Sequence, residues 1–531
     1  MFRETGILYM RALLIYPLFP KSFWSFERVL KLAGQKAVLP PLGLVTVAAI
    51  LPQDWEFRLI DRNIEQVSDV DWDWAEVILV SGMLVQSQDI LVIIREARRR
   101  QKPVAVGGPY ATSFSYEVEA AGANYLVLDE GEFTLPMFVE AVENGDSTGT
   151  FRSTEKPDIT QTPVPRYDLL DLEAYSEMSV QFSRGCPYRC EFCDIIILYG
   201  RKPRTKNPQQ MIIELERLYE LGWRRSVFVV DDNFIGNKRN AKKLLRELEP
   251  WMEAHGFPFT FGTEASLDLA EDTELMNLMT ACNFGAVFLG IETPDEACLA
   301  GSNKQQNLRS SMTESVRRIT ASGLRVMAGF IIGFDAEKSG AGERIARFVD
   351  EAAIPTAFFS MLQALPGTAL WHRLKDEGRL RDSPVTANQT TLMNFLPTRP
   401  MEEIAREYID GFWKVYEPQS FLDRAYRHYR ILGEAPCHKK PGKKRLSKKK
   451  MGWSEFRAFV LILILQGVVR NTRFAFWRYL WQMYRHNPGG VASYLNVCAQ
   501  IEHFLEYRSI IKEEINLQLD SFLAEEAGKE G

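Results

Sequence analysis

The segment Cys186-Pro187-Tyr188-Arg189-Cys190-Glu191-Phe192-Cys193 decides how the rest of the chain is interpreted. It places three thiols within eight residues, directly after an apolar stretch at 180–182 and the turn Ser183-Arg184-Gly185. Three cysteines at these spacings can bind three irons of a four-iron four-sulfur cluster from one loop. The fourth iron would then have no protein ligand and would be free to bind a substrate or cofactor.

Zinc and disulfides explain this spacing less well. A closed structural zinc site needs four ligands, usually in two pairs, whereas the other four cysteines are scattered singly, at Cys282, Cys298, Cys437 and Cys498. Seven cysteines cannot all pair, and the first residues do not resemble a secretory signal, which argues against a disulfide framework. The alternative to a cluster is a zinc site or a purely structural loop.

Length and composition indicate a globular protein of roughly three domains. The 531 residues are 46% hydrophobic and 25% charged. The net charge of -5 gives no overall field that would attract nucleic acid, so we expect no nucleic-acid partner. Free cysteines and an oxygen-sensitive cluster indicate a reducing compartment, which predicts a cytoplasmic protein.

The amino-terminal domain, residues 10–145, alternates β-rich runs with helical segments. This rhythm predicts a parallel, doubly wound, flavodoxin-like sheet whose strands lie at 11–16, 56–61, 77–81, 103–106 and 124–128. Ligands of such sheets bind beyond the carboxyl ends of the strands. Those ends carry Asp61-Arg62-Asn63, Ser81-Gly82-Met83 and Gly107-Gly108-Pro109.

A linker rich in Thr, Ser, Pro and Asp is expected at 146–175, followed by a second α/β domain at 176–378. Six strands are predicted there, at 180–182, 226–230, 259–263, 286–289, 326–332 and 357–362. Six βα units predict a partial (β/α)6 barrel that is open on one side, with its functional face at the carboxyl ends of the strands. Arg201 and Arg204, beyond the cysteines, could anchor a cofactor or simply coat the loop surface.

The carboxyl-terminal domain, residues 379–531, is predicted to be mainly helical. Residues 439–450 include eight Lys and Arg, the apolar stretch 456–469 follows, and residues 473–484 are dense in aromatic residues and Arg. The apolar stretch is shorter than the roughly 20 residues that span a bilayer. The pattern is typical of a helix on an anionic membrane surface, and equally of a solvated lysine loop before a buried helix.

The cysteine motif, with an aromatic residue before its last Cys, resembles the signature of radical S-adenosylmethionine (SAM) enzymes. The resemblance implies that Cys186, Cys190 and Cys193 hold a 4Fe-4S cluster whose open iron binds SAM through its amino and carboxylate groups. It further implies that a reductant such as ferredoxin or flavodoxin supplies the electron that cleaves SAM to a 5′-deoxyadenosyl radical. Phe192 is expected near the adenine, and the alternative is an aromatic residue that simply lines the loop.

The same resemblance assigns SAM-binding roles to residues beyond the second and later strands of the second domain. Asp231, Asp232 and Asn233 would receive the amino group of SAM, although helix N-capping and turn formation are an alternative. Glu264 would accept hydrogen bonds from the ribose. Gly290 and Glu292, together with residues 329–333, resemble the glycine-bearing fifth and sixth strands that let adenosine approach the backbone.

The amino-terminal domain is similar to the cobalamin-binding domain that precedes many radical SAM modules. The resemblance assigns cofactor-binding roles to Asn63, Ser81, Met83, Gly107 and Gly108. Asn63 stands where the family pattern has the cobalt-ligating His, and no histidine precedes His255. Cobalamin would therefore bind without a histidine from this domain. Glycine pairs are also common at strand ends of doubly wound sheets, so a flavodoxin-like domain without cobalamin is the alternative.

Over its whole length the chain resembles the branch of cobalamin-dependent radical SAM methyltransferases that contains the hopanoid C-2 methylase. This implies methylation of an unactivated carbon in ring A of a hopanoid, by a 5′-deoxyadenosyl radical and methylcobalamin, in the cytoplasm or peripherally on the cytoplasmic face of a membrane. No side chain is predicted to act as a general base. The alternatives are ring formation or rearrangement in a porphyrin or natural product, and a non-catalytic cobalamin and cluster sensor.

Overall fold

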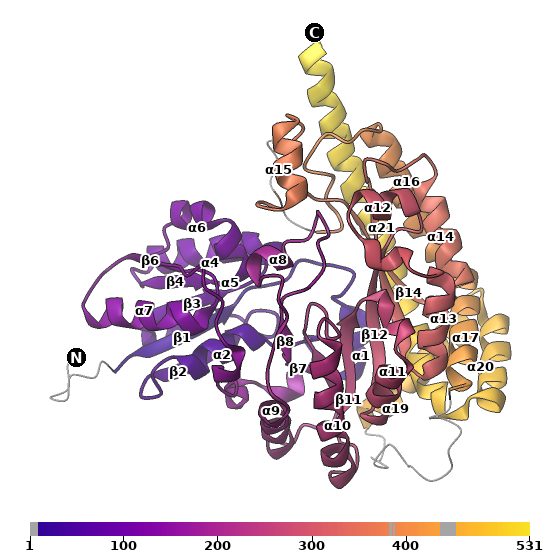
Figure 1. The fold of residues 1–531 in the computed structure, drawn as a ribbon, viewed down its shortest axis with the longest axis horizontal. Helices are drawn as coiled ribbons and strands as arrows, with labels where there is room; N and C mark the ends of the chain where they lie inside the picture. The colour runs from indigo at the N-terminus through magenta and orange to yellow at the C-terminus, as the bar shows by residue number, and fades with distance from the viewer. Residues whose placement is uncertain (1–8, 382–384, 386–387, 436–452, 531) are drawn as a thin grey trace.

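Two parallel six-stranded sheets and a block of helices make up the molecule (Figure 1). The computed structural model describes residues 9–381, 385, 388–435 and 453–530. The first sheet lies in the amino-terminal part of the chain, the second sheet begins just before the cysteines, and the helices follow it. The predicted α/β fold class, with a flavodoxin-like domain, a partial barrel and a helical carboxyl-terminal region, is confirmed.

The first sheet has the strand order β2-β1-β3-β4-β5-β6, and every pair in it is parallel. Its strands are β1 (Arg11–Tyr16), β2 (Glu56–Asp61), β3 (Val77–Ser81), β4 (Val104–Gly107), β5 (Tyr125–Val127) and β6 (Gly149–Phe151). The first five lie where the sequence predicts them. The sixth falls inside the stretch predicted to be linker, because a three-residue edge strand has too little apolar periodicity to be recognised.

Alternate residues of β1 contribute to two hydrophobic cores, one on each face of the first sheet. Leu13 and Ile15 pack on one face and Ala12 and Leu14 on the other. The first face is covered by α3 (Asp69–Trp74), α4 (Ser87–Arg99), α5 (Gly108–Ser113) and α6 (Ser115–Ala121). The second face is covered by α2 (Leu42–Ile50) and α7 (Gly131–Glu143). Burial on both faces explains the continuous apolar runs of these strands.

The second sheet is also parallel, with the order β14-β13-β12-β11-β10-β7 and no pairing between β14 and β7. It is therefore an open partial barrel. Its strands are β7 (Glu177–Val180), β10 (Ser226–Val229), β11 (Thr260–Ala265), β12 (Phe284–Glu292), β13 (Arg325–Ile332) and β14 (Thr356–Met361). The outer helices are α9 (Pro208–Glu220), α10 (Lys238–Ala254), α11 (Thr273–Ala281), α12 (Glu296–Gly301), α13 (Met312–Ser322) and α14 (Ala341–Glu351).

The first strand of this sheet differs from the prediction for 180–182. β7 ends at Val180, and the chain then forms β8 (Ser183–Arg184), which pairs antiparallel with β9 (Arg204–Thr205). The three cysteines and the short helix α8 (Ile195–Leu198) therefore lie within the loop of a hairpin. Its two ends are joined by backbone hydrogen bonds, which hold the cysteine loop at the carboxyl edge of the second sheet.

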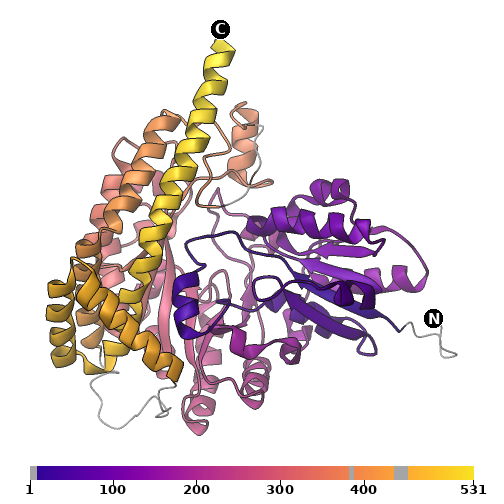
Figure 2. The same cartoon turned by 180° about the vertical axis from the view of Figure 1, so that it is seen from behind.

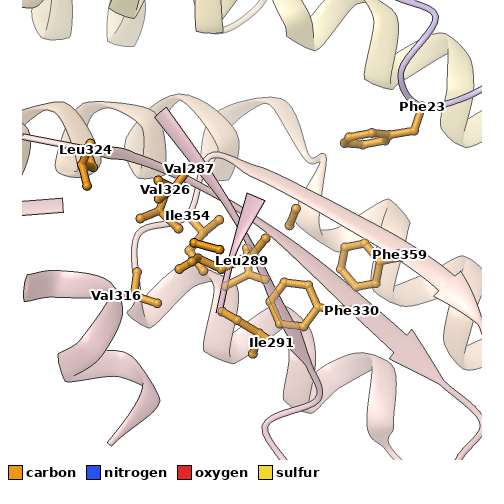
Figure 3. Close-up of a cluster of buried hydrophobic side chains, with 14 of the residues drawn as sticks. Phe23, Val287, Leu289, Ile291, Val316, Leu324, Val326, Phe330, Ile354 and Phe359 are labelled. Atoms are coloured by element: carbon orange, nitrogen blue, oxygen red, sulfur yellow. The ribbon is translucent and has the colours of Figure 1, made fainter. Parts of the chain in front are cut away.

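In the second sheet, successive side chains also point alternately to the outer and the inner face. Val287, Leu289 and Ile291 of β12 are fully buried among helix residues such as Val316 (Figure 3). The intervening Phe288 points to the opposite, inner face and is only partly buried. The outer face thus forms the largest hydrophobic core of the protein, whereas the inner face is left partly open.

Most of the carboxyl-terminal helices extend the β14 side of the second sheet (Figures 1 and 2). The first of them instead contacts the cysteine loop, where the Leu370 N–H donates to the Glu191 carbonyl at 2.9 Å. The helices are α15 (Ala369–Asp376), α16 (Met401–Val415), α17 (Pro418–Gly433), α19 (Trp453–Ile464), α20 (Arg473–His486) and α21 (Val491–Glu530), with a π-helical turn at Leu465–Val469. No helix in the described ranges is long and apolar enough to cross a membrane. The predicted basic run at 439–450 lies outside the described residues.

The segment after β1 joins the two halves of the molecule. Residues 17–26 and helix α1 (Glu27–Ala33) leave the first sheet and reach the second, where Phe23 is fully buried. Its ring stacks on Phe504 and meets Phe358 and Phe412 edge to face. A loop of the first domain is thereby part of the core of the second.

Candidate cofactor site

The cysteine loop brings its three thiols close enough together to interact electrostatically. Burial raises the pKa of Cys186, Cys190 and Cys193. Gly185 begins the loop with a φ of +92°, and a Cβ there would lie 2.7 Å from the Gly200 carbonyl oxygen, so only glycine fits. The hairpin thus presents three neighbouring thiols on a constrained loop.

No three His, Cys, Asp or Glu side chains in the described part of the chain are arranged around one point as ligands of a single metal ion. A four-iron cluster does not require this arrangement. Each thiolate binds a different iron, so the three sulfurs stand apart around the cluster rather than converging. The donor set therefore fits a cluster better than the zinc site considered from the sequence.

A segment that sequence reasoning missed, residues 302–308, packs on the cysteine loop. The Gln306 side-chain amide donates to the Cys190 sulfur at 3.8 Å, and the Glu191 N–H donates to the Ser302 carbonyl at 3.0 Å. Lys304 forms a 2.5 Å ion pair with Glu292. Burial lowers the pKa of Lys304, but Glu292 and the nearby Cys190 outweigh burial and raise it, so its ammonium stays charged beside the thiols.

Acidic side chains gather at the ends of β10, β11 and β12. Burial raises the pKa of Asp232 to about 7 and that of Glu264 to about 8, and each shift is increased by neighbouring carboxylates. For Glu264 these neighbours are Asp232, Asp231 and Glu292. A group of partly buried carboxyls that repel one another favours a cation between them. SAM is a suitable ligand because it has a sulfonium and an ammonium.

Asp231 and Asp232 differ in what they are free to bind. Asp231 accepts hydrogen bonds from the Phe182 N–H and the Ser183 hydroxyl, both at 2.7 Å. It holds the start of the cysteine hairpin, so its carboxylate is already engaged. Asp232 has a buried carboxylate oxygen, Oδ2, with no hydrogen-bond partner among the described residues. An unpartnered buried oxygen is the better candidate for a ligand donor.

Asn233 is also engaged, because its side-chain amide pairs with Ser266 at 3.2 Å. Of the alternative roles for residues 231–233, N-capping is wrong, since Asn237 caps the following helix, α10. Turn formation is confirmed, since the Gly236 N–H donates to the Asn233 carbonyl at 2.8 Å. Phe192 lies partly buried in the cysteine loop and meets Phe334, just beyond β13, with ring centroids 6.0 Å apart.

Gly290 and Glu292 lie on the fourth strand of the second sheet and residues 329–332 on the fifth, so their predicted placement on the fifth and sixth strands is wrong. Glu292 adopts a φ of +66° at a β-bulge, an uncommon conformation for a residue other than glycine. A Cβ on Gly290 would lie 2.5 Å from the Glu292 carboxylate and 3.0 Å from the Lys304 ammonium. The absence of a side chain at Gly290 therefore accommodates this ion pair.

At the first sheet, Ser81, Gly107 and Gly108 meet at adjacent strand ends. A Cβ on Gly108 would lie 2.5 Å from the Ser81 hydroxyl, and one on Gly107 would lie 2.7 Å from the Val127 carbonyl. Both glycines thus already serve close packing of the protein itself. Met83, by contrast, is 52% exposed at the same edge.

Asn63 occupies the position of the absent histidine and binds the loop after β1. Its amide donates to the Asp61 carboxylate at 2.7 Å and to the Pro17 carbonyl at 3.1 Å, and its oxygen accepts from the Phe19 N–H at 2.9 Å. These contacts use the side chain for structure. They leave it no free group directed toward a cofactor.

A buried ion network joins the first sheet to the cysteine hairpin. Glu130 and Glu132 follow β5, and they pair with Arg184 at 2.8 and 2.9 Å. Arg204, on the other strand of the hairpin, pairs with Glu130 at 2.8 Å. The carboxyl edge of the first sheet therefore adjoins the cysteine loop, and a ligand beyond that edge would lie beside the cluster. The sequence suggested that Arg204 either anchors a cofactor or coats the loop surface. The structure shows neither role, because the guanidinium binds Glu130.

Comparisons with known families match three successive parts of the chain. Residues 32–139 match the B12 binding domain, residues 180–349 match the radical SAM superfamily, and residues 368–517 match a domain of unknown function, DUF4070. An uncharacterized methyltransferase of Synechocystis is 59% identical over 97% of this chain and 95% of its own length. The hopanoid C-2 methylase of Rhodopseudomonas palustris is 34% identical over 95% of this chain and 94% of its own.

Solved structures share the fold at low sequence identity. The methyltransferase TsrM of Kitasatospora setae, solved with cobalamin and a [4Fe-4S] cluster, has a TM-score of 0.56 and 17% identity, and the match covers 80% of this chain and 98% of that one. The cobalamin-dependent radical enzyme OxsB has a TM-score of 0.59 and 14% identity, with 97% and 81% covered.

The chain therefore belongs to the radical SAM superfamily, in the group of enzymes that carry a cobalamin-binding domain ahead of the radical SAM domain. Its cofactors are a 4Fe-4S cluster, SAM and cobalamin, as predicted from the sequence. Within this group it is a methyltransferase, in the branch that includes the Synechocystis and Rhodopseudomonas proteins.

Proposed function

We propose that this enzyme methylates an unactivated carbon of a pentacyclic lipid, specifically the A-ring C-2 position of a hopanoid. The proposal is supported by the 34% identity to the hopanoid C-2 methylase along nearly the whole of both chains. The observation that carries it is the apolar inner face of the second sheet, which adjoins the cysteine loop.

That inner face presents partly buried apolar side chains on neighbouring strands. They are Phe288 of β12, Met327 and Ile331 of β13, and Phe358 of β14. Trp24, from the loop after β1, packs on two of them: its ring stacks on Phe358 with centroids 5.7 Å apart and meets Phe288 edge to face at 5.6 Å. Trp24 itself is 37% exposed. A surface of aromatic rings and aliphatic chains suits a fused apolar ring system.

The residues that would hold the cofactors are proposed from their positions. Cys186, Cys190 and Cys193 would hold the cluster, and Asp232 and Glu264 would attract the cationic groups of SAM. When bound, these cofactors together supply hydrogen abstraction and methyl transfer at a carbon without an acidic proton. Such a carbon needs no general base from the protein.

The remaining candidates would act near the cofactors. The SAM site would be lined by Phe192, Asn233, Gly290 and Glu292, while Asp231 holds the cysteine hairpin next to it. The cobalamin site would be lined by Ser81, Met83, Gly107 and Gly108, while Asn63 holds the neighbouring loop in place. The chain's own contribution is then to position the two cofactor sites and to exclude water between them.

Lipid analysis of a deletion strain tests the substrate. We expect loss of 2-methylated hopanoids, restored by the wild-type gene and by Cys298→Ala, a buried cysteine outside the loop, but not by Cys193→Ala. Unchanged methylated hopanoids in the deletion strain would refute the substrate assignment.

Anaerobic incubation with SAM labelled in its methyl group tests the reaction itself, because ring formation in a porphyrin or natural product would leave the product unlabelled.

The partners follow from the same proposal. A low-potential reductant such as ferredoxin or flavodoxin would supply electrons, and the lipid substrate would be reached by a cytoplasmic enzyme in peripheral contact with a membrane. A protein that binds cobalamin and a cluster only as a sensor would release no 5′-deoxyadenosine when reduced in the presence of its lipid.

A further inference from the structure

Helices α19 and α20 and the turn between them carry an unusual concentration of exposed apolar side chains. Eight of the 22 exposed large apolar residues in the described part of the chain fall within residues 459–484. They are Phe459, Ile464, Val468, Val469, Phe474, Trp477, Trp481 and Tyr484. Scattered single residues of this kind are normal on a surface, but a contiguous group indicates a binding face.

The exposed residues of α20 share one side of the helix. Phe474, Trp477, Trp481 and Tyr484 follow a helical spacing of three and four residues and are 76%, 45%, 58% and 70% exposed. The opposite side, with Phe476, Tyr479 and Met483, is buried against the protein. The helix is therefore already packed, and its outward aromatic side is not needed for folding.

The π-helical turn continues this surface. The Trp477 indole N–H donates to the Gly467 carbonyl at 2.9 Å, which fixes the ring against the turn that carries Val468 and Val469. Both valines are 62% exposed. We call the surface formed by Val468, Val469, Phe474, Trp477, Trp481 and Tyr484 the aromatic face.

The segment that carries the aromatic face contains basic but no acidic residues, and the carboxylates nearest to it, Glu502 and Asp423, are engaged by Arg470 and Tyr479. No Asp or Glu occurs between Phe456 and Ile501, whereas the same stretch has five arginines in a chain with a net charge of -5. Arg473 and Arg485 lie over the rings of Phe474 and Trp481, each 4.9 Å from the centroid. Neither they nor Arg478 form an ion pair with a carboxylate of the described residues.

We propose that the aromatic face docks on the surface of an anionic lipid bilayer. Tryptophan and tyrosine, with an apolar ring and a polar tip, suit the headgroup level, the valines and Phe474 suit the acyl boundary, and the arginines suit lipid phosphates. A second copy of the chain is a poorer occupant, because two such faces would bring like charges together. This extends the membrane contact proposed above and assigns it a surface, but it does not depend on the identity of the substrate.

Flotation of the full-length, cluster-loaded protein with vesicles tests the proposal, without SAM or substrate. We expect binding to vesicles of equal parts phosphatidylglycerol and phosphatidylcholine, little binding to phosphatidylcholine alone, and weaker binding at high salt. Combined Phe474→Ser, Trp481→Ser and Tyr484→Ser should weaken binding by about tenfold or more. Combined Arg473→Gln, Arg478→Gln and Arg485→Gln should remove the preference for phosphatidylglycerol.

The matched control is combined Val70→Ser and Tyr116→Ser, which replaces similarly exposed residues of the first domain, 71% and 65% exposed. It should bind as the wild type does. The proposal is overturned if the wild type does not bind, or if the aromatic variant binds equally well. It is also overturned if the wild type forms a dimer that this variant loses while no vesicle binding occurs, since a second copy would then be the occupant. Loss of hopanoid methylation alone would leave this test unaffected.

Discussion

The ion pair between Lys304 and Glu292 lies beside the cysteine loop. Its ammonium lies near Cys190 and Cys193, and its partner carboxylate occupies a left-handed backbone position at the end of β12. Strained conformations of this kind persist where the surroundings hold them, often at functional sites. Here the pair places one positive and one negative charge beside the position proposed for the cluster.

The first prediction concerns the reduction potential of the cluster. Lys304→Met should lower it, because removing a nearby positive charge disfavours the added electron, and Glu292→Gln should raise it for the opposite reason. We expect shifts on the order of tens of millivolts, measured by spectroscopic redox titration without substrate. Lys243→Met, an exposed lysine on α10, is the control. Identical potentials in all four proteins would show that the pair does not act on the cluster.

Glu264 provides a prediction on pH. Burial, together with repulsion that is strongest from Asp232, raises the pKa of Glu264 to about 8, against about 4.3 in an unfolded chain. Between these values the folded state binds more protons than the unfolded state, so this group makes stability fall as pH rises through that window. Thermal unfolding without SAM should show a lower Tm at pH 8 than at pH 6.

Glu264→Gln should reduce that fall in Tm, because the amide cannot ionise. Glu140→Gln, an exposed residue of α7, should retain it. If the glutamine variant at position 264 has the same pH dependence as the wild type, Glu264 is ionised at neutral pH and the acidic group is less strongly coupled than its burial implies.

At the scale of elements, the contact between α14 and α16 joins the partial barrel to the carboxyl-terminal helices. Gly342 and Gly411 face each other across it, and a Cβ on Gly411 would lie 3.1 Å from the Gly342 Cα. A Cβ on Gly342 would lie only 2.1 Å from the Glu407 carbonyl oxygen. Backbone atoms cannot move aside as flexible side chains do, so the helices are close because both positions lack side chains.

Gly342→Ala should therefore destabilise the protein, by about 1 to 3 kcal/mol as for other overpacked interiors. Denaturant unfolding followed by circular dichroism measures this. Gly301→Ala, at the end of α12, is the matched control, since a Cβ there meets nothing within 4 Å. Equal stability of the two variants would mean that α14 and α16 separate at little cost.

At the scale of the whole molecule, the buried network of Glu130, Glu132, Arg184 and Arg204 connects the cobalamin-binding domain to the cysteine hairpin. The Glu130 side chain is 4% exposed and the two arginines are 11% and 14% exposed. The loop carrying Phe23 provides a second connection, into the core of the partial barrel. Together they hold the edges proposed to bind cobalamin and the cluster next to each other.

Glu130→Ala should destabilise this arrangement by about 3 kcal/mol, because breaking a buried ion pair leaves arginines unpaired. We expect a lower unfolding midpoint and faster proteolysis between the two domains. Arg152→Ala, which removes an exposed pair with Asp129, should have little effect. Unchanged protease sensitivity of the Glu130 variant would indicate that the Phe23 loop alone holds the domains together.

Much of the fold could be predicted from the sequence, because its signals are local. Strand and helix periodicities identified ten of the twelve strands of the two main sheets at their observed places; β7 was displaced and β6 missed. The cysteine loop was recognisable because all three proposed ligands of the cluster lie within eight residues. Their spacing in the sequence is therefore enough to identify them. The same local patterns support the family, its three cofactors and its methyltransferase class.

Only the tertiary structure revealed how that loop is supported. Gln306 contacts Cys190 across 116 positions of sequence, and Arg204 meets Glu130 across 74. It also distinguished Asp231, which holds the hairpin, from Asp232, whose buried oxygen is unpartnered. Such roles depend on which side chains the folded chain brings together, and residues distant in sequence have no spacing that reveals their contact. The sequence by itself determined the chemistry of the loop, and the packing around it decided its electrostatic surroundings.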